Sequence, residues 1–247
     1  MGKGLCAHGN VHGKMILWIL LAALMTCHCT FVRSGSNGGA GTKASQILPL
    51  AADLKAGDTF TFGSYEQDND LSNGAEPIEW QVLAVENGRA LVISTYALDA
   101  KPYNETYRYV TWGSSTLRKW LNREFYNSAF SPAEKSCIAE VKTENPGNPS
   151  AGTRGGSPTK DRIFLLSIEE ADRYFGDDDA RLCRATAFAE ANGAYVGENG
   201  CSWWWLRSPG RSGRETALVL YIGYVTHLGH SVIVPSDVVR PAFWLDL

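Results

Sequence analysis

Two apolar runs separated by the dipeptide Asn87-Gly88 constrain the fold of this chain most strongly. The first run reads IEWQVLAVE and the second reads RALVIS, and both are rich in β-branched and other apolar residues. Asn-Gly adopts positive φ angles readily, so it suits the two-residue turn of a β-hairpin. Another strand-like run, TFTFGSYEQ, begins at Thr59. We therefore expect the folded domain to open with an antiparallel sheet.

Three helices are predicted after the hairpin. The segment 115–130 places apolar residues at helical spacing along one face. Two later segments, SPAEKSCIAEV from Ser131 and SIEEADRYF from Ser167, each begin with the Ser-x-x-Glu pattern of a capping box. Pro132 also suits the first position of a helix. The capping signals predict local structure and say nothing about chemistry.

The remaining segments decide the fold class. The segment 144–160 is rich in Gly, Pro and Ser, which predicts a long surface loop. RIFLLS, which precedes Ile168, is strand-like, and the chain returns to short strands after Trp205. Strands, then helices and a long loop, then strands again indicate an α+β domain in which both ends of the chain share one sheet.

The N-terminal part of the chain has a different composition. Two lysines and an apolar run over 15–25 predict a signal peptide or lipoprotein leader over 1–32, because the run is too short to span a bilayer comfortably. The Gly- and Ser-rich composition after it predicts a flexible linker over 33–56, and the folded domain then covers 57–247. Cys27 is a candidate for lipidation, although Met25 and Thr26 fit a lipoprotein box poorly, so simple secretion remains an alternative. We expect membrane contact only through this leader or its lipid.

Charge and cysteine content exclude some classes of partner. The net charge of -3 and the scattered basic residues argue against nucleic acid as a partner. Cys183 and Cys201 are candidates for a disulfide in an exported protein, and two buried thiols are the alternative. Cys137 lies among apolar positions of a predicted helix and is expected in the core. No spacing of Cys and His suggests zinc, and we expect no metal and no cofactor.

Several ordered stretches carry a resemblance to a known family: WQVLAVENGRALVIS, STLRKWLNREFYNSAFS, TKDRIFLLSIEEA, WWLRSPG and VRPAFWLDL. Across 57–247 the chain resembles the bacterial domain family DUF6273, whose function is unknown. More distantly, the Trp-x-Arg-Ser segment and the closing strands resemble the C-type-lectin-like fold, including its formylglycine-generating-enzyme branch. That resemblance implies a compact α+β domain with short antiparallel strands, about three helices and long loops that present a binding face.

The segment CSWWWLRSPG is the first candidate site. Adjacent side chains of an extended segment point to opposite sides, so at least one of the three tryptophans should face the core while a neighbour faces outward. Trp204 and Arg207 are candidate ligand contacts, and packing inside the domain is the alternative for both. Arg207 and Arg240 are also expected to act as clamps of the closing strands.

The segment 216–238 is the second candidate site, because side chains expected to face water are apolar or aromatic. Its 23 residues include no Lys, Glu, Gln, Met or Trp, and every residue present can be encoded by a codon ending in a pyrimidine. This repertoire resembles that of variable proteins of diversity-generating retroelements, although a β-rich composition explains part of it. The candidate ligand contacts here are Tyr221, Ile222, Tyr224, His227, Leu228 and His230.

No catalytic constellation is present in the sequence. Ser208 lacks a Gly-x-Ser-x-Gly elbow, and the run Asp177-Asp178-Asp179 lacks the alternating spacing of calcium loops. We therefore expect no enzyme, and interpret the chain as an exported or surface-held recognition module for a protein or glycan. Two alternatives remain: an enzyme with an oxidising cysteine or metal site at Cys183 and Cys201, and a structural cell-envelope domain without a ligand.

Overall fold

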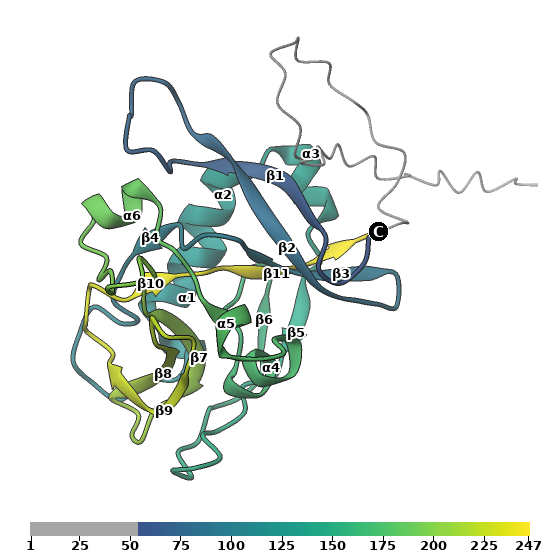
Figure 1. Ribbon diagram of the computed structural model, residues 1–247. Coiled ribbons are helices and arrows are strands. Elements are labelled where there is room, and N and C mark those ends of the chain that lie inside the picture. The colour runs from purple at the N-terminus through teal and green to yellow at the C-terminus, as the bar shows by residue number, and fades with distance from the viewer. Residues whose placement is uncertain (1–53) are drawn as a thin grey trace, which may run out of the picture.

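A computed structural model describes residues 54–247 (Figure 1). The domain contains both helices and strands, which confirms the predicted α+β class. The predicted leader, linker and lipidation site at Cys27 lie outside the described residues. Within the described part of the chain, no helix has the length and apolar composition needed to cross a bilayer.

The first sheet joins the two ends of the described chain. Asn87 and Gly88 have φ angles of 51° and 74°, and Glu86 pairs with Arg89 across the turn, which confirms the predicted hairpin. The last strand pairs with the third in antiparallel orientation, which confirms that both ends share one sheet. The strands, in spatial order, are β1 (Thr59–Tyr65), β2 (Glu76–Glu86), β3 (Arg89–Ser94) and β11 (Ala242–Asp246).

The second sheet has five strands, of which β7, β8 and β9 lie below β11 in Figure 1. One neighbouring pair, β10 and β7, is parallel, and the other pairs are antiparallel. The strand β9 is at one edge of this sheet. In spatial order the strands are β4 (Asp99–Ala100), β10 (Val238–Val239), β7 (Trp204–Pro209), β8 (Glu215–Val219) and β9 (Val225–Ser231).

The longest helical segment packs against the first sheet. Leu117, Leu121 and Phe125 are buried along one face, as their spacing predicts. A π-helical turn widens the middle of this segment. The segment consists of η2 (Trp112–Ser114), α1 (Thr116–Trp120), η3 (Leu121–Phe125) and α2 (Tyr126–Ala129).

Capping boxes begin both other predicted helices. Ser131 caps α3 (Pro132–Cys137) with Glu134 at the third position, and Ser167 caps α4 (Ile168–Tyr174) with Glu170. Cys137 at the end of α3 is buried, as expected. Two further short helices were not predicted, α5 (Asp178–Arg181) and α6 (Ala187–Ala191), and Asp177 is the N-cap of α5.

The long loop 144–158 emerges from a two-stranded ribbon of β5 (Val141–Thr143) and β6 (Thr159–Asp161). RIFLLS, which follows β6, is not a regular strand: only Phe164 forms a bridge, with Ala242. Its four apolar residues are buried nevertheless and belong to the hydrophobic core: Ile163, Phe164, Leu165 and Leu166. Its apolar composition was therefore a signal of burial rather than of sheet pairing.

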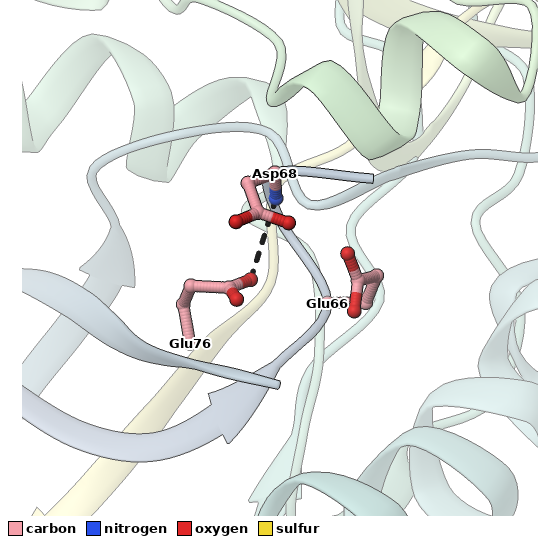
Figure 2. Close-up of side chains that lie close together, drawn as sticks. All are labelled: Glu66, Asp68 and Glu76. Atoms are coloured by element: carbon pink, nitrogen blue, oxygen red, sulfur yellow. Dashed lines mark hydrogen bonds between the residues drawn. The ribbon is translucent and has the colours of Figure 1, made fainter. Parts of the chain in front are cut away.

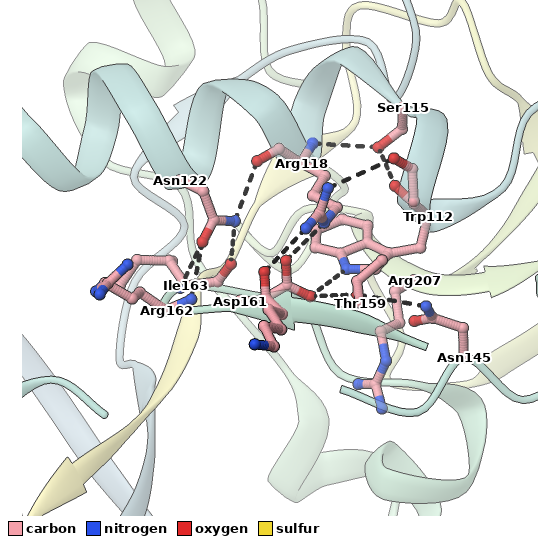
Figure 3. Close-up of polar contacts among 12 residues, drawn as sticks. Trp112, Ser115, Arg118, Asn122, Asn145, Thr159, Asp161, Arg162, Ile163 and Arg207 are labelled. Carbon is pink, nitrogen blue, oxygen red and sulfur yellow. Dashed lines mark hydrogen bonds and ion pairs between the residues drawn. The ribbon is translucent and has the colours of Figure 1, made fainter. Parts of the chain in front are cut away.

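A buried carboxylate fixes the ribbon to the helical segment (Figure 3). Asp161 accepts hydrogen bonds from the indole Nε1 of Trp112 at 2.9 Å, from Thr159 at 2.6 Å and from the guanidinium of Arg118 at 2.6 Å. Asn122 adds bonds to the backbone of Arg162 and Ile163. A buried charge is stable only when it is paired and hydrogen-bonded, and Asp161 meets both conditions. The network therefore anchors the base of the long loop.

Candidate functional site

The structure disperses the eight side chains predicted to contact a ligand. They occupy the core, the opposite sides of β9 and the turn between β8 and β9. Trp204 and Arg207 are buried, Tyr221, His227 and His230 are partly exposed, and Ile222, Tyr224 and Leu228 are exposed.

The structure corrects the prediction for Trp204. The side chain is fully buried, and its Nε1 donates to the carbonyl oxygen of Arg181 at 3.1 Å. Its ring packs against Phe175, and the guanidinium of Arg240 lies 5.1 Å from the ring centroid. Phe175 and Arg240 cover its side of β7, so Trp204 offers no surface to a ligand and stabilises the fold instead.

Arg207 is also a structural residue. It is 3% exposed and pairs with Glu170, with 2.7 Å between Nη2 and Oε1. It also donates to the carbonyl oxygens of Glu144 and Leu165. These bonds hold β7 to α4 and to the start of the long loop. Arg240, which donates to Ser94, is a second such clamp. Of the two interpretations of these arginines, the structure favours the structural one.

Trp203 directly precedes β7 and is the tryptophan of this segment whose side chain is partly exposed. Its ring centroid lies 4.8 Å from that of Tyr195, 5.5 Å from that of His230 and 6.5 Å from that of Tyr221. All four side chains are at least partly exposed. We call the rings of Tyr195, Trp203, Tyr221 and His230 the aromatic face.

The floor beneath this face is rigid. Trp205 is fully buried on the same side of β7, with its centroid 6.4 Å from that of His230. Its Nε1 donates to the carbonyl oxygen of Lys101 at 2.9 Å. Trp203 and Trp205 therefore share one side of the segment and Trp204 lies on the other, as the alternation predicts.

A buried carboxylate orients the histidine of the aromatic face. Asp237 is 0% exposed, and its Oδ2 lies 2.8 Å from Nδ1 of His230. This hydrogen bond raises the pKa of His230, although partial burial acts in the opposite direction. Burial also raises the pKa of Asp237, while its bond with the histidine opposes that shift. With Asp237 ionised, Nδ1 carries the proton and Nε2 of the neutral ring is an acceptor.

Two polar atoms next to these groups have no protein partner. Within residues 54–247, neither Nε1 of Trp203 nor Oδ1 of Asp237 makes a hydrogen bond, and both atoms are buried. Unpaired buried polar atoms cost about 1–3 kcal/mol each and are rare in folded proteins. Both atoms lie beside the partly exposed His230, so the unpaired polar atoms of the aromatic face lower the stability of the folded domain.

The turn beside the aromatic face is held in one conformation. Gly223 has a φ of 82°, and a side chain there would collide with the backbone of Asp178. Arg181 donates to the carbonyl oxygen of Gly223 at 2.9 Å, and Asn199 donates to that of Tyr221 at 2.8 Å. The ring of Tyr221 also packs closely on the backbone of Gly197. The face is therefore preorganised by its neighbours.

His227 belongs to a different surface. Its Nδ1 lies 2.7 Å from the hydroxyl of Ser150, and it lines a groove of about 550 Å³ between the long loop and α4. Ile168 and Ser208 form part of the same groove. The structure thus separates His227 from His230, although both lie on β9.

The two cysteines predicted as a disulfide candidate are both free, buried thiols in the structure. Ser202 donates to the carbonyl oxygen of Cys183 at 2.8 Å, so the two chain segments are adjacent. Burial raises the pKa of the Cys183 thiol, which favours the protonated form. Because the thiolate is the nucleophile and the metal ligand, this environment does not activate Cys183.

One group of carboxylates could hold a cation among the described residues (Figure 2). Glu66, Asp68 and Glu76 place oxygen atoms within 4.8 Å of one another. The backbone amides of Gln67 and Asp68 donate to Glu76, and Asn73 donates to Asp68. These bonds account for most of the arrangement as a loop held by local polar contacts.

The comparisons with known proteins place the chain in a family. Residues 87–247 match the domain of unknown function DUF6273, and the chain belongs to this family. The matched segment begins at the turn of the hairpin, whereas the sequence resemblance predicted a start at residue 57. Neither the curated proteins nor the solved structures include a match to this chain.

Three residues of the site were not predicted as ligand contacts: Tyr195, Trp203 and Asp237. Trp203 was considered only as one of three equivalent rings, because alternation does not say which side of a strand is covered. Tyr195 precedes β7 in an irregular segment without a periodic signal. Asp237 is recognisable only once the structure brings it beside His230.

Proposed function

We propose that this chain is a recognition module of C-type-lectin-like fold that binds a protein or glycan at the aromatic face. The resemblance to that fold implies loops that present a binding surface beside a compact sheet. The arrangement of β7, β8 and β9 with the segments that hold their turn supports this proposal.

The observation that carries the proposal is that tightly packed rings and unpaired buried polar atoms occur together at the aromatic face. Within residues 54–247, the unpaired atoms there are Nε1 of Trp203 and Oδ1 of Asp237. Trp203 lies above the buried Trp205, while Tyr195 and Tyr221 lie next to each other beside it. Large aromatic side chains supply contact area at little cost in conformational entropy, and they are enriched where proteins bind partners. The buried unpaired atoms beside them indicate a surface that is not optimised for the free protein alone.

Fragment soaking tests this proposal without knowledge of the ligand. Crystals of residues 54–247 would be soaked with a library of small sugars, amino acids and aromatic compounds. We expect the bound fragments to concentrate on Trp203 and His230. Fragments confined to the groove beside His227, or no ordered fragment on the aromatic face, would contradict the proposal.

The proposal includes export, on the basis of the leader pattern over 1–32. If Cys27 is lipidated, cells expressing the full chain incorporate labelled palmitate into it, and Cys27→Ser abolishes the incorporation. If the chain is secreted instead, both forms appear unlabelled in the medium. Retention of both forms in the cytoplasm would contradict export.

The proposal also includes diversification of the segment 216–238. The exposure of Ile222, Tyr224 and Leu228 supports it, because substitutions there do not disturb the core. Val238 does not support it, since this residue is fully buried. Sequencing of the gene's locus would show a near-copy of the codons for this segment beside a reverse transcriptase gene; absence of both would contradict diversification.

A further inference from the structure

We propose that the ligand of the aromatic face is a neutral saccharide, whose ring stacks on Trp203 and whose hydroxyl groups bond to His230 and to the neighbouring tyrosines Tyr195 and Tyr221. This inference rests on the proposed function and names the chemical class of its ligand. A protein partner is the competing outcome of the test.

The first argument is the geometry of the rings. Tyr195 and Tyr221 lie next to each other beside Trp203, with 6.0 Å between their own ring centroids, and the plane of Tyr221 is tilted by only 16° from that of the indole. His230 meets the indole at 70°, edge to face. The faces of aromatic rings carry partial negative charge and attract the weakly positive C–H groups of a sugar ring. Two or more neighbouring aromatic rings together offer such a platform for a sugar ring.

The second argument is the distribution of charge. No side chain of the aromatic face carries a fixed charge, and the buried Asp237 is paired with His230. The amine of Lys101, which follows β4, is 3.2 Å from Asp99 and lies over the ring of Trp120. An anionic ligand needs an available cation, and a cationic ligand needs an exposed carboxylate. The face supplies neither, which favours a neutral ligand.

The third argument is the supply of hydrogen bonds around the platform. Within the described part of the chain, the hydroxyls of Tyr195 and Tyr221 and Nε2 of His230 make no hydrogen bond. Each sugar hydroxyl both donates and accepts, so it matches phenol and imidazole groups equally. The buried unpaired atoms of Trp203 and Asp237 fit ordered water behind the platform, which would extend the same network.

The state of His230 distinguishes a saccharide from a charged ligand. When the ring is neutral, Nε2 accepts a hydrogen bond; when it is protonated, Nε2 donates one. A hydroxyl group bonds to both forms, whereas a carboxylate prefers the protonated one. Among the described residues, Asp237 is the titratable group that contacts this ring. Affinity for a neutral saccharide should therefore change by less than about threefold as His230 titrates.

The test is a titration followed through the indole N–H of Trp203 in ¹H–¹⁵N NMR spectra. The probes are methyl glycosides of glucose, galactose, mannose and N-acetylglucosamine and their short neutral oligomers, each up to about 20 mM. We expect at least one saturating shift, at pH values on both sides of the His230 titration. Trp203→Ala and Tyr195→Ala should each weaken binding about tenfold or more, because each removes part of the platform. Binding to Trp203→Ala, which lacks the reporting indole, is followed through the backbone amide signal of His230.

The control variant is Tyr96→Ala. Tyr96 is 43% exposed, close to the 41% of Tyr195, and makes no ring contact with the aromatic face. It should leave saccharide affinity unchanged within about twofold. Circular dichroism confirms folding of each variant; if Trp203→Ala does not fold, Tyr195→Ala carries the test.

Two negative results separate the inference from the proposed function. If no saccharide shifts the indole resonance while peptides or aromatic fragments do, the saccharide inference is overturned and the face remains a binding site. If no probe of any kind shifts it, both are overturned. A saccharide that binds equally well to Tyr195→Ala and to Trp203→Ala binds elsewhere, and this result also overturns the inference.

Discussion

The two sides of the segment 203–207 differ in how completely their polar groups are satisfied. On the side of Trp204 and Arg240, the aromatic ring and the guanidinium group are buried, and their polar atoms bond to backbone carbonyl oxygens. On the side of Trp203, the rings of Trp203 and His230 are partly exposed above the buried Trp205, and within residues 54–247 an indole N–H and a carboxylate oxygen lack partners. The first side has the properties of a structural frame, and the second those of a recognition surface.

This difference shows that residue type does not decide role within one short segment. Trp203 and Trp204 have different environments because the strand alternates its side chains and because Phe175 and Arg240 cover the ring of Trp204. Four measurements test this comparison, beginning with the largest expected effect.

Substitution of the adjacent tryptophans contrasts the two sides most strongly. Trp204→Ala removes a fully buried ring and should destabilise the domain by about 3–5 kcal/mol. Trp203→Ala removes a partly exposed ring and an unpaired donor, so it should cost about 1 kcal/mol. Urea unfolding followed by circular dichroism gives both values. Equal losses of stability would contradict the assignment of frame and face.

Substitution of Glu170, the carboxylate partner of Arg207, tests how much this ion pair contributes to stability. Glu170→Ala leaves a buried guanidinium without a carboxylate and should destabilise the domain by about 3 kcal/mol. The matched control is Glu169→Ala, because Glu169 is the exposed neighbour in the same helical turn. Its unfolding free energy should stay within about 0.5 kcal/mol of the parent protein. If the two variants unfold alike, the clamp contributes little.

The rigidity of the turn is tested at Gly223. Gly223→Ala combines a positive φ with a collision against the backbone of Asp178, so it should cost about 2 kcal/mol or more. Gly74→Ala is the control, since Gly74 has a φ of 88° but open space around it, and should cost about 1 kcal/mol. Thermal unfolding measures both. Indistinguishable losses would mean that the turn yields without disturbing its neighbours.

The smallest expected effect concerns the pair His230 and Asp237. Because the hydrogen bond raises the pKa of His230 above its unfolded value, its contribution to stability is complete below the unfolded pKa. The contribution is lost as the pH rises through the folded pKa. Asp237→Asn should lower the His230 pKa in an NMR titration, and its loss of stability should be larger at about pH 5.5 than at about pH 8.

An unchanged His230 pKa in Asp237→Asn would show that the carboxylate does not orient the ring. The asparagine variant keeps the shape of the side chain, so a fall in the pKa reports the missing charge rather than a cavity.

The sequence predicted those parts of the structure that depend on near neighbours. The turn at Asn87-Gly88 and the capping boxes of α3 and α4 are set within a few residues, and the structure confirms them. RIFLLS was misinterpreted because apolar composition reports burial and not hydrogen-bond pairing.

The candidate site was predicted only in part, because its contacts join distant segments. Tyr221 and His230 were predicted, and both belong to the aromatic face. Trp203 reached the surface instead of Trp204 because Phe175 and Arg240 cover the other side of the strand. No local pattern indicates which of two adjacent rings such distant residues will cover.

The most direct test of the account compares two indole resonances in one experiment. A mixture of neutral saccharides and aromatic fragments would be added to ¹⁵N-labelled protein while the Nε1–H signals of Trp203 and Trp204 are followed. The account predicts that the Trp203 signal shifts and saturates while the Trp204 signal, whose N–H is bonded to Arg181, stays in place. A stationary Trp203 signal, or equal shifts of both, would contradict it.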